Sequence, residues 1–345
     1  MRLMGAALRL SRRNEGLTGI NPCVGCLIVR DGVVVGRGVT GRVPTDTEAY
    51  ALRRAGKTVP AGGRPHAERA ALDDAGEAAR GATAYVTLEP CAHHGNTPPC
   101  ADALIEAGIA RVVVGADDPD PRVAGAGIGR LREAGIPVAT GAMADECRAQ
   151  LAPFLNRMER GRPHVLLKLA VSPDGYIGRS DRGNVAVTGP VSRAQVHLMR
   201  ARADAVVIGA GTAMLDRPRL DVRLPGLENR SPSGVVLDRR GSFRRMLRSE
   251  RERTGLGVHA HATPAAFLDL AHEAGWGLVM VEGGATLARA FLEADLVDEI
   301  ALFVGAEPIG GDVASPIAPD HVPGGFALVR EDRFGPDRLL TYWRR

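Results

Sequence analysis

Hydrophobic and polar positions follow two alternating periodicities along the first half of the chain. Short apolar runs rich in valine predict strands, and segments whose apolar positions recur three and four residues apart predict helices. We expect strands within 23–40, 82–88, 111–116 and 136–140, and helices within 66–76, 101–108 and 128–135. Asp31-Gly32 divides the first apolar stretch and predicts a β-hairpin. Strands that alternate with helices indicate an α/β sheet that is at least partly parallel.

The same alternation begins again after a long helical stretch at 144–161 and Pro163. A chain of 345 residues exceeds the size at which one hydrophobic core stops growing, so two domains are expected. We place the first domain at 1–148, a linker at 149–162 and the second domain at 163–345. The second half is expected to form strands within 164–172, 204–210, 234–238, 278–282 and 299–304, helices within 191–203, 264–275 and 285–295, and surface loops at 226–234 and 239–253.

Charge and composition narrow the classes of function. The net charge is +4, but arginine and acidic residues alternate without a basic run, and aromatic residues make up only 4%. This pattern argues against a nucleic-acid groove and is compatible with a small anionic substrate. No segment approaches the roughly 18 apolar residues of a membrane span, and the first residues do not resemble a secretory signal. With a cytoplasmic location expected, the five cysteines favour metal binding or catalysis over disulfides.

One group of residues has the donor types and the spacing of a zinc site. His66 lies at a predicted helix start, and Cys91 and Cys100 flank the loop after a predicted strand. One imidazole and two thiolates suit tetrahedral zinc, and three protein ligands leave the fourth position for water, as a catalytic site requires. Glu68 follows His66 by two residues, where its carboxylate can carry protons from water to a leaving amine. This H-x-E…P-C pattern is the signature of zinc-dependent deaminases of nucleobase-like rings.

A structural zinc site with His93 or His94 as fourth ligand is the alternative reading of the same loop. A Cys-x-His pair lacks the usual gap of two to four residues between zinc ligands. We therefore expect these histidines to line the pocket and face the substrate.

The chain resembles the bifunctional deaminase/reductase family of riboflavin biosynthesis over nearly its whole length. In the first half the resemblance rests on NPCVGCLIV, GGRPHAE and TAYVTLEPCAHHGNTPPCADALIEAGIARVVVGADDPDPRVAGAG. In the second half it rests on LLKLAVSPDG, RARADAVVIGAGTAMLD and VEGGATLARAFLEADLVDE. The resemblance implies a cytidine-deaminase-like α/β/α domain followed by a dihydrofolate-reductase-like α/β domain.

The family's two reactions are thereby implied for this chain. The first is zinc-dependent hydrolytic deamination of 2,5-diamino-6-ribosylamino-4(3H)-pyrimidinone 5′-phosphate. The second is reduction of the ribosyl to a ribityl side chain by NADPH. The resemblance also implies a homodimer or homotetramer.

Residue roles carry over by matched position. The resemblance implies zinc ligands at His66, Cys91 and Cys100, and a proton shuttle at Glu68. The implied substrate contacts are Asn21, His93, Asn184, Arg200, Leu220, Arg223 and Glu282. The implied cofactor contacts are Val171, Ala186, Thr212, Asp216, Gly284, Ala285 and Thr286. Independently of the family, a strand followed by Gly-Gly and a helix can present backbone N–H groups to a phosphate of NADPH, and Arg200 and Arg223 can clamp a substrate phosphate.

The chain departs from the family pattern mostly in the second half. Asn96 stands where the family commonly has a lysine or arginine, and an insertion near 42–61 precedes the zinc histidine. Ala186 replaces a tryptophan and Asn184 a serine, and 216–223 reads DRPRLDVR in place of D-D-P-x-L-T-x-R. The insertion contains EAYALRRAG, which echoes ERAALDDAG at a spacing of 20 residues.

These departures keep further functional readings open. One is a monofunctional deaminase with a degenerate, non-catalytic second domain. A deaminase acting on tRNA or DNA is disfavoured because those relatives usually have two residues between the cysteines. A zinc-stabilised sensor of a flavin precursor would bind ligand without turnover and would need a fourth protein ligand on the metal.

Overall fold

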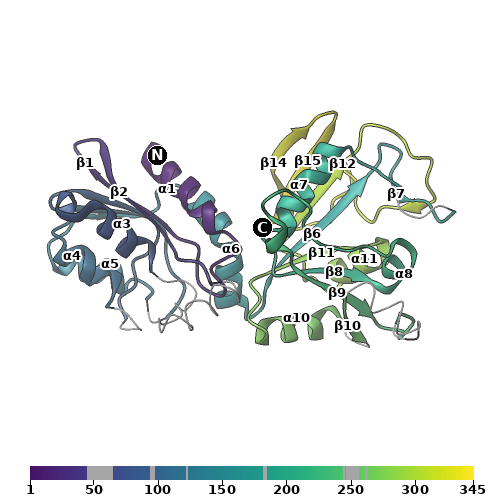
Figure 1. Cartoon of the computed structure of the whole chain (residues 1–345), viewed down its shortest axis with the longest axis horizontal. Coiled ribbons are helices and arrows are strands. Elements are labelled where there is room, and N and C mark those ends of the chain that lie inside the picture. Colours follow the sequence, from purple (N-terminus) through teal and green to yellow (C-terminus); the bar gives the residue numbers. More distant parts are fainter. Residues whose placement is uncertain are drawn as a thin grey trace. The chain divides into compact units, whose positions relative to one another are not determined.

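The chain folds into two compact units, Met1–Gly161 and Arg162–Arg345 (Figure 1). The computed structural model describes residues 1–44, 65–93, 98–121, 123–181, 185–243, 245, 256–260 and 263–345. The stretch 149–162, expected to be a linker, is mostly the C-terminal part of helix α6 (Ala144–Arg160). Leu151 and Leu155 of that helix belong to the hydrophobic core of the first unit. Their burial makes most of the expected linker part of the first unit.

The first unit is a three-layer α/β/α arrangement around a five-stranded sheet in the order β2-β1-β3-β4-β5. Its strands are β1 (Gly25–Arg30), β2 (Val33–Val39), β3 (Thr83–Leu88), β4 (Arg111–Ala116) and β5 (Val138–Ala139). Beside α6, its helices are α1 (Arg2–Ser11), α3 (Ala67–Ala75), α4 (Cys100–Glu106) and α5 (Ala126–Glu133), with short 3-10 turns at Arg12–Asn14 and Gly76–Ala79. β1 pairs antiparallel with β2 and β3, whereas β3, β4 and β5 are parallel. Helices α1 and α6 cover one face, and α3, α4 and α5 cover the other.

Two local sequence signals explain how the first unit forms. Asp31 and Gly32 both have positive φ, as a two-residue hairpin turn between β1 and β2 requires. Gly38 of β2 lets the start of α3 approach closely, because a Cβ there would lie 1.9 Å from the carbonyl oxygen of Ala67. That close contact holds the helix that carries His66 and Glu68 against the sheet.

The second unit is built on an eight-stranded sheet in the order β10-β9-β8-β11-β6-β12-β15-β14. Its strands are β6 (His164–Val171), β8 (Ala205–Gly209), β9 (Ser233–Asp238), β10 (Gly257–Ala260), β11 (Leu278–Glu282), β12 (Glu299–Val304), β14 (Phe326–Phe334) and β15 (Asp337–Arg344), and β7 (Tyr176–Gly178) pairs separately with β13 (Val313–Ala314). The helices are α7 (Pro190–Arg200), α8 (Ala210–Asp216), α10 (Pro264–Glu273) and α11 (Ala285–Glu293), with a 3-10 turn at Glu228–Arg230. The strands from β10 to β12 are parallel, and β15 and β14 add antiparallel pairs at one edge. Phe267 of α10 and Phe291 of α11 belong to one core cluster, and Val196 of α7 belongs to a second.

The predicted alternation of strands and helices is confirmed in both units, and the sheets are partly parallel as expected. The elements not predicted are α1, α8, β7, β10, β13, β14 and β15. β14 shows why, since it is a mostly exposed edge strand in which charged residues interrupt the apolar pattern. The loop expected at 226–234 ends earlier, because β9 begins at Ser233. Most of the loop expected at 239–253, and most of the insertion near 42–61 with its echo helix, lie outside the described residues.

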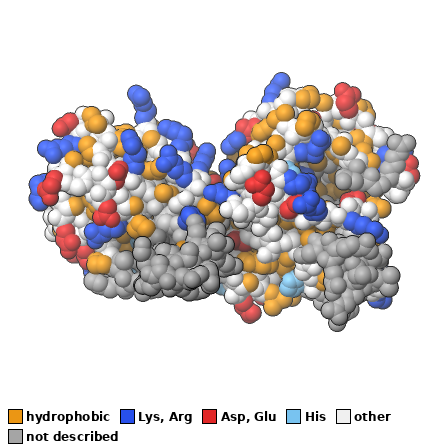
Figure 2. Space-filling view, viewed as in Figure 1, with side chains coloured by type: hydrophobic (Ala, Val, Ile, Leu, Met, Phe, Trp, Pro, Cys, Tyr) orange, Lys and Arg blue, Asp and Glu red, His pale blue; other side chains and the backbone are white. Residues whose placement is uncertain are grey.

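Basic and acidic side chains are interspersed over the face shown in Figure 2, in agreement with their alternation in the sequence. None of the described helices is long and apolar enough to cross a membrane.

Candidate functional sites

The predicted zinc ligands come together in the first unit, although they lie on three separate segments. His66 occupies the N-cap position of α3, Cys100 is the first residue of α4, and Cys91 follows the end of β3. The Nδ1 atom of His66 lies 3.2 Å from Cys100 Sγ and 3.6 Å from Cys91 Sγ. All three donor atoms lie within 4.8 Å of one another.

This geometry fits a tetrahedral zinc ion. Zn–N and Zn–S bonds of about 2.0 and 2.3 Å at tetrahedral angles put a nitrogen and a sulfur about 3.5 Å apart. The two His66 distances bracket that value, and the nitrogen-plus-two-sulfur donor set is one that zinc prefers. Among the described residues the cluster contains three donors.

The two cysteine side chains shift each other's pKa in opposite directions. A hydrogen bond between them lowers the pKa of Cys91 to about 4 and raises that of Cys100 above its ordinary value. The backbone N–H of Cys100 also donates to Cys91 Sγ over 3.3 Å. Because zinc binds thiolates, loading the site releases the remaining thiol proton.

Glu68 lies on the first turn of α3 and is only 4% exposed. Burial raises the pKa of its carboxyl to about 7, although the neighbouring His66 opposes this shift. A carboxyl group that titrates near neutrality can both accept and return a proton. The Glu68 carboxyl lies close enough to His66, Cys91 and Cys100 for all three to affect its pKa.

His93 and Asn21, the two residues expected to face the substrate of the first unit, lie in different environments. His93 follows Cys91 by two residues, and its Nδ1 atom is buried without a hydrogen-bond partner among the described residues. Asn21 lies in the segment before β1, where its Nδ2 group donates to the Thr18 carbonyl over 3.1 Å. His94 and Asn96 lie outside the described residues.

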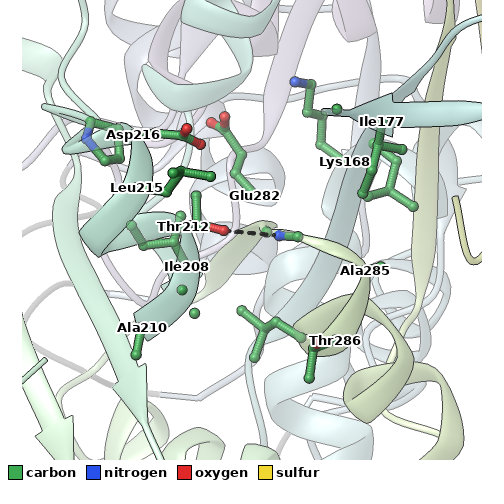
Figure 3. A pocket seen from close by; sticks show the side chains of 18 of the residues that line it. Lys168, Ile177, Ile208, Ala210, Thr212, Leu215, Asp216, Glu282, Ala285 and Thr286 are labelled. Carbon is green, nitrogen blue, oxygen red and sulfur yellow. Dashed lines mark hydrogen bonds between the residues drawn. The ribbon is translucent and has the colours of Figure 1, made fainter. Parts of the chain in front are cut away.

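The second unit contains a cavity of about 1380 Å³ that reaches the C-terminal ends of β6, β8, β9 and β11. Ten of the residues expected at this site line it: Ala186, Arg200, Thr212, Asp216, Leu220, Arg223, Glu282, Gly284, Ala285 and Thr286. Figure 3 shows Lys168, Thr212, Asp216 and Glu282 around the same space. Val171 instead lines a separate cavity of about 770 Å³, and Asn184 lies outside the described residues.

The Gly-Gly turn lies at the N-terminus of α11, as the sequence predicts. The backbone N–H of Gly284 donates to Thr212 Oγ1 over 3.2 Å, which joins this turn to α8 (Figure 3). The first N–H groups of a helix lack partners within the helix, so they can bind an anion. The turn and the first residues of α11 line the cavity.

Arg200, expected to clamp a phosphate, is already paired in the structure. Its guanidinium donates to both carboxylate oxygens of Glu282 over 2.6 and 2.8 Å, and each side chain is 11% exposed. Burial would raise the pKa of Glu282, but these bonds hold it below its ordinary value. A third bond runs from Arg200 to the carbonyl of Asp221 over 3.1 Å. The pair therefore joins α7 to the end of β11 at the cavity wall.

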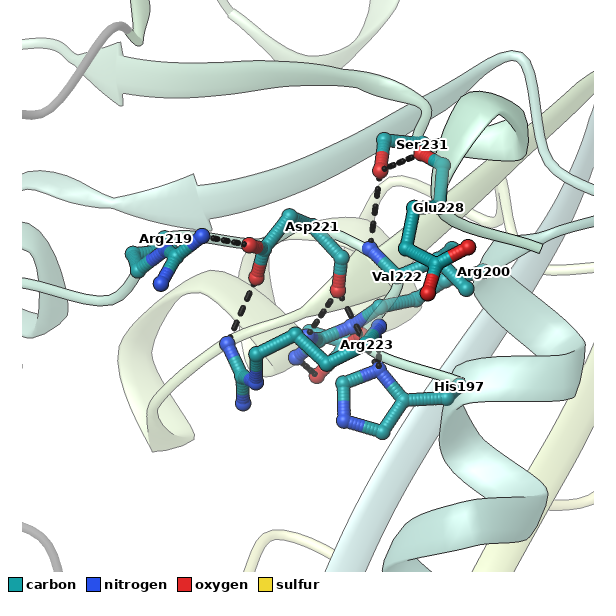
Figure 4. Close-up of polar contacts among 9 residues, drawn as sticks. His197, Arg200, Arg219, Asp221, Val222, Arg223, Glu228 and Ser231 are labelled. Atoms are coloured by element: carbon teal, nitrogen blue, oxygen red, sulfur yellow. Dashed lines mark hydrogen bonds and ion pairs between the residues drawn. The ribbon is translucent and has the colours of Figure 1, made fainter. Parts of the chain in front are cut away.

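A neighbouring cluster surrounds the side chain of Asp221 (Figure 4). Its two oxygens pair with Arg219 over 2.6 Å and with Arg223 over 2.5 Å. The Nδ1 atom of His197 lies 3.2 Å from the carbonyl oxygen of Asp221. The preceding residue, Leu220, has a positive φ of 57°. Figure 4 shows Arg219 and Arg223 approaching the Asp221 carboxylate from different sides. Asp221, which stands where the family pattern has a threonine, is therefore bound to both arginines.

Lys168 is one residue of this cavity that sequence reasoning missed. It lies on the central strand β6, and its ammonium group is 5.9 Å from the centre of the Phe303 ring. Burial lowers its pKa, while the nearby Glu282 opposes that change. A lysine within the apolar run LLKLAV was the available signal, since lysine is rarely buried without a specific role.

Comparison with known proteins agrees with both sites. Residues 1–116 match the family described as cytidine and deoxycytidylate deaminase zinc-binding region, and residues 163–335 match the family described as RibD C-terminal domain. Riboflavin biosynthesis protein RibD of Escherichia coli is 38% identical over 90% of this chain and 88% of its own length. The chain belongs to the RibD family.

Other members of the RibD family are similar over almost the whole chain. RibD of Mycobacterium tuberculosis is 36% identical over 98% of this chain and 95% of its own length. The structure of Acinetobacter baumannii RibD matches with a TM-score of 0.78 and 34% identity, covering 99% of this chain and 98% of that one.

The deaminase/reductase of Thermotoga maritima, which acts on phosphoribosylaminopyrimidines, matches with a TM-score of 0.82 and 32% identity over 99% of this chain and 97% of that one. With both a deaminase and a reductase domain of the RibD family, the chain is a bifunctional enzyme of riboflavin biosynthesis.

Proposed function

We propose that the first unit deaminates 2,5-diamino-6-ribosylamino-4(3H)-pyrimidinone 5′-phosphate and that the second unit uses NADPH to reduce the ribosyl group of the product to ribityl. The observation that carries this proposal is the cluster of His66, Cys91 and Cys100 with Glu68 buried beside it. The Gly-Gly turn at the second cavity supports the reductase step. The reactions named for the T. maritima relative agree with this pair of sites.

In the deaminase reaction, water replaces the ring amino group, a C–N bond breaks and ammonia leaves. His66, Cys91 and Cys100 would hold zinc, which when bound acidifies a water molecule for the attack. Glu68 takes a proton from the attacking water and returns it to the leaving amine. The elevated pKa that burial gives Glu68 suits both steps, because the carboxyl must change its protonation state twice in each cycle.

In the reductase reaction, NADPH when bound would supply a hydride to the first ribosyl carbon, the bond from that carbon to the ring oxygen would open, and the freed oxygen would take a proton. The N–H groups at the start of α11 would bind a phosphate of the cofactor, and Thr212 holds the preceding turn through the Gly284 N–H. Thr286 and Asp216 line the same cavity and would be further cofactor contacts. Arg223 would bind the substrate phosphate.

A volume of about 1380 Å³ exceeds the 300–1,000 Å³ of an ordinary small-molecule pocket, which suits joint binding of a dinucleotide and a substrate.

The alternative of a deaminase with an inert second unit is not favoured. The second unit matches the RibD C-terminal domain, and its cavity keeps Asp216, Arg223, Glu282 and the Gly-Gly turn. A zinc-stabilised sensor would need a fourth protein ligand, and the described residues supply three.

A cytoplasmic location and a homodimeric or homotetrameric state complete the proposal.

Glu68→Gln tests the assignment of the proton shuttle. The amide preserves size but cannot accept a proton, so ammonia release should fall by a factor of about 10² to 10⁴. Zinc content should stay near one ion per chain, and NADPH oxidation on the already deaminated substrate should not change. A coupled assay of ammonia release and NADPH oxidation, with metal analysis on the same sample, measures all three.

Glu77→Gln is the matched control, because Glu77 lies on the exposed surface of the same unit. Unchanged deamination in Glu68→Gln would remove Glu68 from the mechanism, and absence of NADPH binding at millimolar cofactor would restore the inert-second-unit alternative.

A further inference from the structure

Glu89 is a buried acid next to the zinc cluster that the proposed mechanism does not use. It follows β3 directly, is 3% exposed, and its backbone N–H extends the pairing of β3 with β4 by donating to the Ala116 carbonyl over 2.9 Å. Buried carboxylates are costly unless their oxygens accept hydrogen bonds. The partners of Glu89 therefore indicate what its burial achieves.

All three partners of the carboxylate are backbone N–H groups at the start of α5. Gly125 donates to Oε2 over 3.1 Å, and Gly127 and Ile128 donate to Oε1 over 3.1 and 3.2 Å. α5 has no cap of its own, because Gly125 at its N-cap position has no side chain. Glu89 thus caps α5 from a distant segment, and its negative charge also interacts favourably with the helix dipole.

The contact between the two segments continues at the next residue. A Cβ on Gly127 would lie 1.8 Å from the carbonyl oxygen of Pro90, so only glycine lets α5 approach this closely. Cys91 then accepts on its carbonyl from the Ala101 N–H over 3.2 Å and on its sulfur from the Cys100 N–H over 3.3 Å. Residues 89–91 are therefore fixed one after another between α5 and α4.

We propose that Glu89 and Gly127 are positioning residues for the zinc ligand Cys91. His66 is the N-cap residue of α3 and Cys100 is the first residue of α4, but Cys91 neither belongs to nor caps a helix or strand. Its position depends on how the segment after β3 is held against α5. The hydrogen bonds of Glu89 attach the segment to α5, and the missing side chain of Gly127 lets the segment lie close to the helix. The inference rests on the proposed zinc site of the first unit.

The test measures zinc release from the full-length, zinc-loaded protein to an excess of a chromogenic chelator. Partners outside the ligand set commonly change metal affinity by about 10- to 100-fold when removed. Glu89→Ala and Gly127→Ala should each release zinc at least about tenfold faster than wild type. Glu89→Gln keeps one acceptor oxygen, so its rate should lie between those of wild type and Glu89→Ala.

A second readout is the absorption spectrum of the cobalt-substituted protein. A displaced Cys91 should weaken the sulfur-to-cobalt band in Glu89→Gln and in Gly127→Ala. Glu133→Ala is the charge control, because Glu133 is exposed on the same helix. Leu131→Ala is the control for a general loss of stability. Leu131 is fully buried on α5, but it donates no hydrogen bond to the Glu89 carboxylate.

The outcomes separate the inference from the proposed function. Wild-type release rates in Glu89→Gln and Gly127→Ala, or equally fast release and an equal spectral change in Leu131→Ala, would overturn the positioning role. If Glu89→Ala does not fold, Glu89→Gln decides by the same criteria. A wild-type protein that binds no zinc would instead refute the zinc site on which the inference rests.

Discussion

At the scale of single residues, Asp221 adds a carboxylate beside two arginines that line the large cavity of the second unit. Its carboxylate pairs with both Arg219 and Arg223, and Arg223 is the residue proposed to bind the substrate phosphate. The family pattern has a threonine here, which carries no charge. A carboxylate beside a phosphate site repels the incoming phosphate and competes for its arginine partners.

Asp221→Thr should therefore lower the KM for the phosphorylated substrate of the reductase by about three- to tenfold. The kcat should change less, because the phosphate is remote from the reacting carbon. Steady-state NADPH oxidation at low and high salt measures this, and the difference should shrink at high salt as charges are screened. A higher KM would show that Asp221 instead holds the two arginines in place.

Residue identity alone carried the prediction of the metal cluster but did not place every residue of the second unit's site. Zinc chemistry limits its ligands to a few residue types, so His66, Cys91 and Cys100 stand out from the sequence. Val171 was expected at the cofactor but lines a different cavity. Lys168 was overlooked, although it lies in the cavity beside Glu282. The direction of a strand residue depends on neighbouring strands that the local pattern does not reveal.

At the scale of elements, the residues that lead into β6 and β12 are joined by a largely buried ion pair at the start of the second unit. Arg162 donates to both oxygens of Asp298 over 2.6 and 2.8 Å, and the Val165 N–H donates to Asp298 Oδ2 over 2.8 Å. The two side chains are 13% and 5% exposed. Burial would raise the pKa of Asp298, but Arg162 and His164 hold it below its ordinary value.

Asp298→Asn should destabilise the second unit by about 3 kcal/mol, since it leaves the Arg162 charge buried without its counter-charge. Both tryptophans, Trp276 and Trp343, lie in the second unit, so urea unfolding followed by tryptophan fluorescence reports on it selectively. Asp269→Asn, at an exposed position on α10, is the control and should change stability by less than about 0.5 kcal/mol.

The same pair gives the sign of the pH dependence. The folded pKa of Asp298 lies below its ordinary value of 3.8, so its contribution is complete at neutral pH. It is lost as the pH falls below about 4 and the carboxylate becomes protonated. The wild-type unit should lose stability in this range more steeply than Asp298→Asn, and equal slopes would contradict the assignment.

At the scale of the whole molecule, each unit has its own core and its own candidate site. The zinc cluster and Glu68 belong entirely to Met1–Gly161, whereas the large cavity is lined entirely by residues of Arg162–Arg345. No described residue of the second unit contributes a ligand to the metal cluster. The two activities should therefore respond independently to removal of the metal.

Treatment with a zinc chelator should abolish ammonia release while NADPH oxidation on the deaminated substrate continues at the untreated rate. Adding zinc back should restore deamination, and magnesium should not, because magnesium prefers oxygen ligands over thiolates. Parallel loss of both activities would indicate that the second unit also depends on the metal.

The sequence by itself determined the alternation of strands and helices, the division into two units and the donor types of the metal cluster. These features follow from local periodicity and from the chemistry of histidine and cysteine, which neighbours elsewhere in the chain do not alter. Only the tertiary structure decided that Glu89 caps α5, that Arg200 is bound to Glu282 and that Lys168 enters the cavity. Each of these contacts joins residues far apart in the chain, so it depends on packing between elements that no local pattern contains.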